Sequence, residues 1–138
     1  MKLFRVLYFL SSFKKGDFIK EVRIINQLDL DAFSKLTGDH NQIHKNLKGN
    51  RPMIHGAFLN SIVAAIIGTK LPGNGSIVVS QNFKFPSKCF ANDPIEFYVE
   101  LLDVRKIIQV HYKCTQNNNV VFKGDAKLIM NKKMNNVE

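Results

Sequence analysis

The segment from Ala57 to about Thr69 constrains the fold more than any other part of the sequence. Its residues are apolar on nearly every face of a helix, with small Ala and Ser residues between larger ones. A helix of this kind is buried on every side or crosses a membrane. The run is too short to cross a bilayer, because it ends at Leu71-Pro72-Gly73. The sequence therefore predicts a central core helix.

Everything after this helix is patterned as β-strands. Apolar and polar residues alternate, and turn residues at 92–94 and 117–119 separate the runs. The apolar sets expected to share a face are Ile77, Val79, Phe83 and Phe85; Ile95, Phe97, Val99 and Leu101; Ile108, Val110, Tyr112 and Cys114; and Val120, Phe122, Ala126, Leu128 and Met130. Alternation with period two predicts an antiparallel sheet with one face on a core. A curved antiparallel sheet wrapped around a central buried helix is the hot-dog fold, of the α+β class, and we predict this fold.

The region before the core helix supplies one more strand and a short helix. Residues 16–27 are patterned as a strand, and residues 28–38 as a helix. In that helix we expect Asp29 to act as the cap, and Gly38 to end it in a left-handed turn. Leu30, Phe33 and Leu36 are expected to share its apolar face. A single domain is predicted over 16–131, followed by a tail over 132–138.

The first fifteen residues, "MKLFRVLYFLSSFKK", contain four basic residues and no acid. A mitochondrial import segment is basic, amphipathic and poor in acids, so residues 1–15 fit that profile. An ordinary strand or helix is the alternative. We expect import into the mitochondrial matrix, with a cytoplasmic location as the alternative, and we expect no transmembrane segment.

The chain carries 20 Lys and Arg against 11 Asp and Glu, a formal charge of +9. This charge favours anionic partners in general. The sequence shows no zinc-finger spacing, stacking motif or recognition-helix pattern, so we interpret the charge as a solvated basic surface and expect no nucleic-acid partner. Cys89 and Cys114 are far apart in sequence and lack a secretory signal before them, which favours two reduced thiols.

The heptapeptide "GDHNQIH" (38–44) is the segment that packing does not explain. It places the carboxylate of Asp39 close in sequence to the imidazole of His44. One interpretation is an Asx turn after a helix stop, with His44 merely exposed. The other is a pair of groups that hold a water molecule and move protons. His40 and His111 are interpreted as solvated side chains.

His55 and Gly56 stand at the start of the core helix. Free backbone N–H groups and the helix dipole favour negative charge there, and glycine lets a ligand approach the backbone. The Gly56 N–H would suit a carbonyl oxygen that gains charge, but Gly56 could equally relieve crowding. Asp39, His44 and His55 offer three metal ligands, but their spacing matches no standard zinc pattern, and we expect no metal.

Together these groups suit one class of reaction. A carboxylate and an imidazole can hold a water molecule, while a helix N-terminus stabilises an enolate-like oxygen. These three groups together suit the addition or removal of water across the double bond of an α,β-unsaturated thioester.

Two ordered motifs resemble those of one protein family. The stretch "LTGDHNQIH" resembles the hydratase-2 motif of the MaoC-like (R)-specific enoyl-CoA hydratases, whose usual form is Gly-Asp-x-Asn-Pro-x-His. The stretch "IHGAFLNSIVAAIIGTKLPGNGSIVVSQNFKF" is similar to the core helix and following strand of that family. The resemblance runs from about Gly16 to about Met130, and is strongest to mitochondrial 3-hydroxyacyl-thioester dehydratases of type 2.

The resemblance implies roles for four residues. Asp39 and His44 would be the catalytic dyad, Gly56 would polarise the thioester carbonyl through its N–H, and Asn41 would orient the turn. It also implies a homodimer, no metal or redox cofactor, and a substrate carried on coenzyme A or acyl carrier protein. The implied activity is that of a hydro-lyase, an (R)-3-hydroxyacyl-thioester dehydratase or enoyl-thioester hydratase, in fatty acid metabolism and foremost in mitochondrial fatty acid synthesis.

Three departures from the family pattern support a different interpretation. Gln42 replaces the usual proline, Ala64 stands where many members have serine, and the link from His44 to His55 is short and basic. The alternative function is a hot-dog protein that binds acyl thioesters without turning them over. A thioesterase is less favoured, because residues 57–69 contain no Asp or Glu.

Overall fold

The computed structural model describes residues 13–131 and Lys133 of the chain. Most of the expected import segment 1–15 and most of the tail 132–138 lie outside the described residues. Phe13, at the beginning of the described part, already packs against the hydrophobic core.

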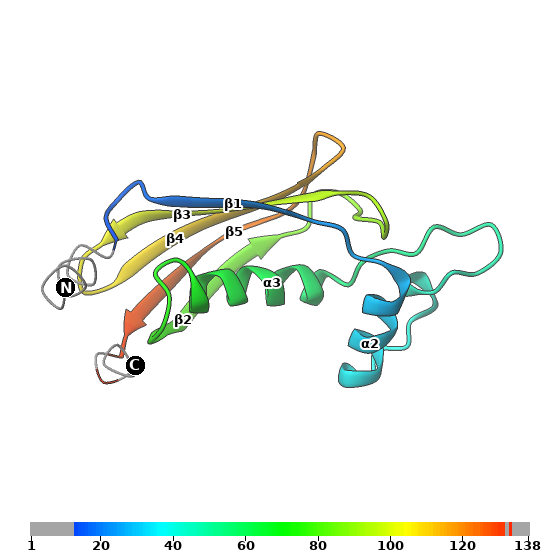
Figure 1. The fold of residues 1–138 in the computed structure, drawn as a ribbon, viewed down its shortest axis with the longest axis horizontal. Coiled ribbons are helices and arrows are strands. Elements are labelled where there is room, and N and C mark those ends of the chain that lie inside the picture. The colour runs from blue at the N-terminus through cyan, green and yellow to red at the C-terminus, as the bar shows by residue number, and fades with distance from the viewer. Residues whose placement is uncertain (1–12, 132, 134–138) are drawn as a thin grey trace, which may run out of the picture.

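The described chain forms one five-stranded antiparallel sheet and two α-helices (Figure 1). The elements follow the order β1 (Phe18–Arg23), α2 (Gln27–Thr37), a 3₁₀ turn (Gln42–His44), α3 (Gly56–Thr69), β2 (Ser76–Lys84), β3 (Ile95–Val104), β4 (Ile108–Gln116) and β5 (Asn119–Met130). In space the strand order is β1-β3-β4-β5-β2, so that β1 and β2 are the two edge strands. The helix α3 runs along one face of the curved sheet, and α2 lies beyond its end. The predicted hot-dog fold is confirmed.

The alternation predicted for β3, for β4 and for β5 from Phe122 onward is confirmed, but the placement of Val120 is wrong. The register with β4 skips Val121, which is buried next to Phe122, and Val120 pairs with Thr115 on the other face. On β3 and β4 every second side chain is almost fully buried, beginning at Ile95 and Ile108. In the middle of the pair these positions face buried partners, as Phe97 does with Cys114 and Val99 with Tyr112. Since the intervening residues are polar, the sheet presents one apolar face to α3. The turn between β4 and β5 places Asn117 and Asn118 at positive φ, a conformation that asparagine tolerates better than most residues.

The prediction that α3 is buried on every side is wrong for the single chain. Its larger side chains are buried against the sheet: Leu59, Ile62, Val63, Ile66 and Ile67. Its small residues lie on the opposite face and are exposed: Ala57, Ser61, Ala64 and Ala65. A small residue leaves little apolar area in water, which is why the sequence could keep this face apolar without covering it within one chain. Among the described residues no helix has the length and apolarity needed to span a membrane.

The face predicted for β2 is wrong at its beginning. The register between β2 and β5 shifts between Val78 and Ser80, so that Val79 is an extra residue in a β-bulge. Ile77 pairs with Ile129 on the outer face, whereas Val78 pairs with the buried Leu128 on the inner face. One inserted residue exchanges the two faces of a strand.

Two details of the first helix also differ from the prediction. The cap of α2 is Asn26, whose side chain accepts a hydrogen bond from the N–H of Asp29, while the Asp29 carboxylate accepts from the Asn26 N–H. Asp29 is therefore the third residue of a capping box. Leu36 does not share the buried face, because its side chain is 85% exposed. Gly38 ends the helix in the left-handed region, with φ of 80°, as predicted.

Candidate active site

The turn after α2 is built from consecutive hydrogen bonds of its own side chains. The Thr37 hydroxyl accepts the N–H of Asp39 at 3.2 Å. One carboxylate oxygen of Asp39 accepts the N–H of Asn41 at 3.1 Å, and the Asn41 side-chain oxygen accepts the N–H of Ile43 at 3.3 Å. The Asx turn expected after Gly38 is therefore present, and Asn41 caps the 3₁₀ turn that carries His44.

His44 is buried, so the alternative in which it is merely exposed is wrong. Its side chain is almost enclosed, with 6% of the residue exposed. Its Nδ1 atom lies 2.7 Å from the carbonyl oxygen of Met53. Since a carbonyl oxygen only accepts hydrogen bonds, Nδ1 carries the proton of the neutral ring, and Nε2 is left as an acceptor.

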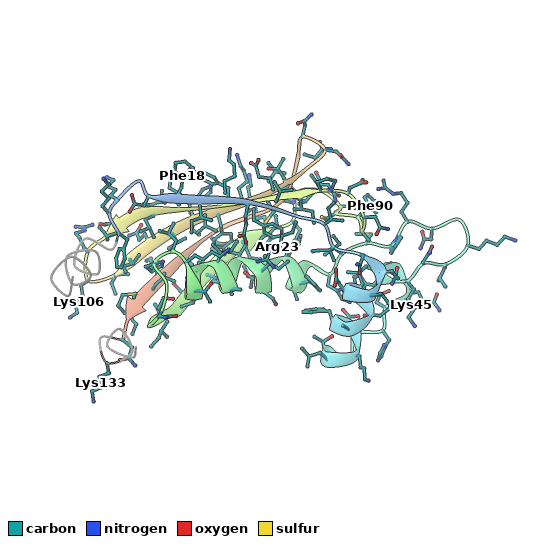
Figure 2. The ribbon with its side chains drawn as sticks, in the orientation of Figure 1. Phe18, Arg23, Lys45, Phe90, Lys106 and Lys133 are labelled. Atoms are coloured by element: carbon teal, nitrogen blue, oxygen red, sulfur yellow. The ribbon has the colours of Figure 1, made fainter. Side chains whose placement is uncertain are left out.

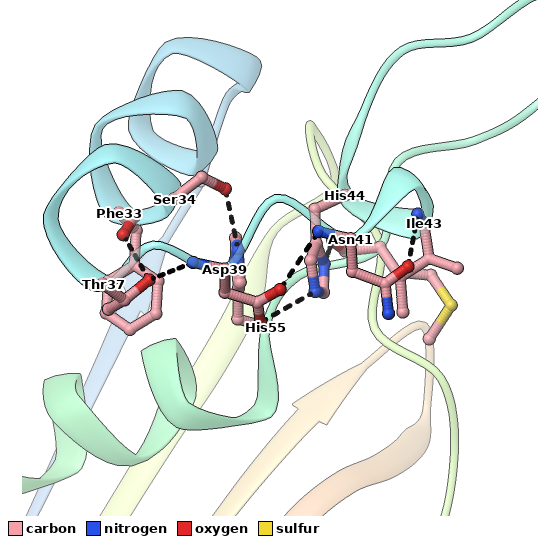
Figure 3. A network of polar contacts seen from close by, with 9 residues as sticks. Phe33, Ser34, Thr37, Asp39, Asn41, Ile43, His44 and His55 are labelled. Atoms are coloured by element: carbon pink, nitrogen blue, oxygen red, sulfur yellow. Dashed lines mark hydrogen bonds and ion pairs between the residues drawn. The ribbon is translucent and has the colours of Figure 1, made fainter.

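The free side of His44 faces Asp39 (Figure 3). His44 Nε2 lies 3.6 Å from the second carboxylate oxygen of Asp39, which is half-exposed. Two acceptors at this separation do not hydrogen-bond each other while both are unprotonated. A single water molecule or substrate hydroxyl, about 2.8 Å from each atom, would contact both. The arrangement suits a group that holds one oxygen and exchanges protons with it.

His55 lies directly beside this pair, a contact that the sequence did not reveal. Its ring stacks on that of His44 with centroids 3.5 Å apart and an interplanar angle of 19°. Its Nε2 atom lies 3.0 Å from the hydroxyl of Ser34, and the Phe33 ring packs on its other side at 4.8 Å. Burial, followed by the nearby His44 ring, lowers the pKa of His55 and keeps it neutral. The sequence had grouped His55 with Asp39 and His44 only as possible metal ligands, and gave no sign of the ring stacking or of the contact with Ser34.

The three candidate metal ligands do come together. One ligand atom each from Asp39, His44 and His55 lie within 4.8 Å of one another. A metal ion binds an imidazole nitrogen in the plane of the ring at about 2 Å. The nitrogen lone pairs of an imidazole lie in the plane of its ring. Because the His44 and His55 rings are stacked face to face, their lone pairs point in nearly parallel planes and cannot both be directed at one ion. The stacked geometry therefore does not suit a shared metal.

Gly56 is the first residue of α3, next to His55. Its N–H is one of the helix-terminal donors that the helix itself leaves unpaired. A Cβ atom at this position would lie 2.6 Å from the ring of Phe85. The crowding interpretation of Gly56 therefore has a structural basis, and it does not conflict with a ligand at the N–H.

The remaining histidines and the departures from the motif are located as follows. His40 is exposed, and His111 lies on the outer face of β4, 3.0 Å from the Asp125 carboxylate. Gln42 begins the 3₁₀ turn, where proline is favoured but not required. Ala64 lies on the open face of α3. Cys89 and Cys114 are buried free thiols.

Comparisons with known proteins find hydratases and dehydratases of acyl thioesters. No family model matches this chain. The chain is 29% identical over 118 residues to the 3-hydroxybutyryl-CoA dehydratase of Methylorubrum extorquens, covering 79% of this chain and 75% of the relative. It is 26% identical over 134 residues to the (R)-specific enoyl-CoA hydratase of Rhodospirillum rubrum, covering 91% and 93%. It is 28% identical over 130 residues to the mitochondrial 3-hydroxyacyl-[acyl-carrier-protein] dehydratase of Arabidopsis thaliana, covering 85% and 77%.

The fold agrees with these relatives. The solved (R)-hydratase of Aeromonas caviae superimposes with a TM-score of 0.80 at 24% identity, covering 88% of this chain and 99% of that one. In sequence and in fold, the chain is similar to the MaoC-like (R)-specific enoyl-CoA hydratases. These similar proteins are named as hydratases and dehydratases, and mitochondrial plant proteins are found among them alongside bacterial ones.

Proposed function

We propose that this chain interconverts (R)-3-hydroxyacyl and trans-2-enoyl thioesters, with Asp39 and His44 as its catalytic residues. One observation carries the proposal: the His44 Nε2 atom and an Asp39 carboxylate oxygen face each other at 3.6 Å as two acceptors. A substrate water bound there would be oriented by both groups. The family motif places an acid and a histidine at the same two positions.

The reaction needs no redox chemistry, and its atoms balance with one water molecule. In the hydration direction the water oxygen bonds to carbon 3 of the enoyl thioester, while the dyad accepts one of its protons. The electron pair of the double bond moves toward the thioester carbonyl, where the Gly56 N–H stabilises the enolate oxygen. Carbon 2 then takes a proton from the dyad. Dehydration is the same sequence reversed.

Asn41 supports the dyad in this proposal without contacting the substrate. Its backbone N–H holds one oxygen of Asp39, which leaves the other oxygen directed at His44. Its side chain caps the short turn on which His44 is carried. Asn41 is thus a positioning residue.

The carrier and the pathway belong to the proposal as well. We assign the acyl group to acyl carrier protein or coenzyme A, both anionic, and the pathway to mitochondrial fatty acid synthesis. Two plant relatives at 27–28% identity are named as mitochondrial dehydratases of acyl carrier protein substrates. The basic, acid-free first fifteen residues agree with import into the mitochondrial matrix. Sequencing the N-terminus of protein recovered from mitochondria tests this location, and an intact Met1 in a cytosolic fraction would contradict it.

The working unit in this proposal is a homodimer formed through α3 and β2. β2 is an edge strand. Large apolar side chains in it or directly after it are exposed in the single chain: Ile77, Val78, Val79, Phe83 and Phe85. The small-residue face of α3 lies open as well. An exposed apolar edge strand is a surface on which a second copy of the chain can pack.

Loss of enoyl absorbance on mixing the protein with crotonyl-CoA, followed by chiral analysis of the product, tests the activity. We expect the (R)-3-hydroxy product, and we expect Asp39→Asn to slow its formation by about 10²–10⁴-fold. Longer enoyl-CoAs and acyl-carrier-protein substrates extend the test across chain length and carrier. A folded protein that turns over none of them would support the alternative of a non-catalytic acyl-thioester-binding protein.

A further inference from the structure

The position of one backbone carbonyl decides which nitrogen of His44 carries the proton. The Met53 carbonyl oxygen accepts from His44 Nδ1 at 2.7 Å. If Met53 moved away, the ring would be free to take the other tautomer, and Nε2 would present a hydrogen instead of a lone pair to Asp39. The state of His44 therefore depends on what holds Met53.

Met53 is held between two segments of backbone. Its N–H donates to the Ile43 carbonyl at 2.8 Å, which ties it to the turn that carries His44. On its other side it forms an antiparallel bridge with Phe90. The neighbouring N–H of Ile54 donates to the Cys89 carbonyl at 2.8 Å, and the N–H of Ala91 to the Pro52 carbonyl at 3.0 Å. The position of residues 52–54 is therefore set by the position of the loop 89–93.

The loop 89–93 is fixed to the sheet by the side chain of Gln116, the last residue of β4. Gln116 is 3% exposed, and its amide oxygen accepts the N–H of Phe90 at 2.9 Å. Its amide nitrogen donates to the carbonyls of Phe90 at 2.8 Å and of Asp93 at 3.2 Å. A buried amide with its oxygen and both hydrogens engaged holds a loop firmly, because each lost bond would leave a buried group unpaired.

A second clamp holds the same loop from the surface. The Arg51 guanidinium donates to the Asp93 carboxylate at 2.7 Å and lies 4.5 Å above the Phe90 ring. Asn117 donates to the same carboxylate at 3.2 Å. Arg51 belongs to the short basic link between His44 and His55, and the carboxylate and the ring already engage its guanidinium. Figure 2 shows Phe90 and Lys45 at the same end of the molecule, with Lys106 at the opposite end.

We propose that Gln116 and the Arg51–Asp93 pair are positioning residues that fix the tautomer of His44 through the Met53 carbonyl. Neither touches the site: the effect passes from the end of β4 through the loop 89–93 to Met53. The proposal rests on the proposed function only for its kinetic readout. The tautomer itself is measured without substrate.

Three variants test this inference in the full chain. Arg51→Met and Asp93→Asn break the surface clamp while leaving the core intact. Gln116→Met removes the buried amide at similar volume. Arg105→Met is the control, because Arg105 forms a surface ion pair with Asp103 at the far end of β3, away from the loop 89–93. Long-range ¹H–¹⁵N correlation of the imidazole nitrogens, assigned with His44→Gln, reports the tautomer.

In the unchanged protein we expect His44 to be protonated on Nδ1. In Arg51→Met and Gln116→Met we expect a measurable population of the Nε2 tautomer, and kcat lower by about tenfold for Gln116→Met with KM nearly unchanged. Arg105→Met is expected to change neither. Because Gln116→Met could reduce stability, thermal unfolding and circular dichroism accompany each variant, and Arg51→Met keeps the inference testable if Gln116→Met fails to fold.

An unchanged His44 tautomer in folded Arg51→Met and Asp93→Asn proteins would overturn the inference, as would an equal shift in Arg105→Met. A failure of the proposed function has a different signature. It would show as no turnover by the unchanged protein, with the tautomer and its response to Arg51→Met still measurable.

Discussion

The imidazole rings of His44 and His55 lie nearly parallel, with their centroids 3.5 Å apart. Two imidazoles this close resist simultaneous protonation, since each positive charge raises the cost of the other. Because His55 is buried and bonded to Ser34, it is the member of the pair that stays neutral. A neutral His55 places no positive charge beside His44.

This relationship predicts how stability changes with pH. His55 has a pKa lowered from 6.5 by burial and by His44. In the unfolded chain it takes a proton near pH 6.5, while in the folded chain it does not until a lower pH. The unfolded state therefore binds more protons in that interval, and stability falls as pH decreases below about 6.5. Urea unfolding across this range should show a smaller loss for His55→Phe, which keeps the ring stack but cannot titrate. Equal slopes for the two proteins would contradict this account of His55.

The proposed dyad predicts large kinetic effects with small structural ones. Asp39→Asn keeps the shape and most turn hydrogen bonds of a half-exposed side chain but removes its charge. His44→Ala removes the acceptor facing it. We expect each to lower kcat by about 10²–10⁴-fold, the usual contribution of a positioned acid or base. Enoyl-thioester hydration measures the rate, and His111→Ala on the outer face is the control. Near-normal turnover by either variant would remove that residue from the mechanism.

The contact between position 56 and Phe85 predicts that a second substitution restores activity lost in a first one. In Gly56→Ala the new methyl group would meet the Phe85 ring at 2.6 Å, so the ring or the first turn of α3 must shift. We expect a lower kcat/KM for Gly56→Ala, and recovery of most of it in Gly56→Ala/Phe85→Ala, because alanine keeps the N–H proposed to bind the carbonyl. Steady-state kinetics of both single variants and the double variant measure the coupling. If the double variant does not recover, the space beside Gly56 is needed by the substrate itself.

The two thiols are expected to be inert in the folded protein. Burial raises the pKa of Cys89 to about 12 and raises the pKa of Cys114 as well. The reactive species is the thiolate, which is scarce at neutral pH when the pKa is raised. Iodoacetamide at neutral pH should label neither residue in the native protein and both in urea, as read by mass spectrometry. Rapid native labelling of Cys89 would show that the loop 89–93 opens.

Much of the fold was predictable because its signals are local. Alternation along β3 and β4 and the apolar run of α3 each follow from a repeat that a few residues establish. The bulge at Val79 was not predictable. In the sequence Ile77 and Val79 fit a regular alternation, and only the register with β5 shows that the alternation is interrupted there. Asn26 and Asp29 are both good capping residues, and only the structure shows which begins the helix.

The site divides in the same way. The proposal of Asp39 and His44 as a dyad came from a contiguous motif. The control of His44 through Met53 and Gln116 depends on a side chain from the end of β4, distant in sequence, and no local pattern encodes such a contact. The exposure of one face of α3 was not predicted for a different reason. Apolar composition indicates that a surface is covered, but not whether the same chain or a second copy covers it.

The proposed dimer predicts an asymmetry between the two edges of the sheet. Val79 on β2 and Val22 on β1 are both exposed valines in the single chain, at 52% and 62%. If a second copy covers β2 and α3, a lysine at Val79 would bury a charge in the interface, whereas a lysine at Val22 would remain in water. We expect Val79→Lys to convert the dimer to a monomer, and Val22→Lys to leave it unchanged. Size-exclusion chromatography with light scattering measures the mass of each. A monomer for the unchanged chain would refute the dimer, and a dimer that survives Val79→Lys would place its interface away from β2.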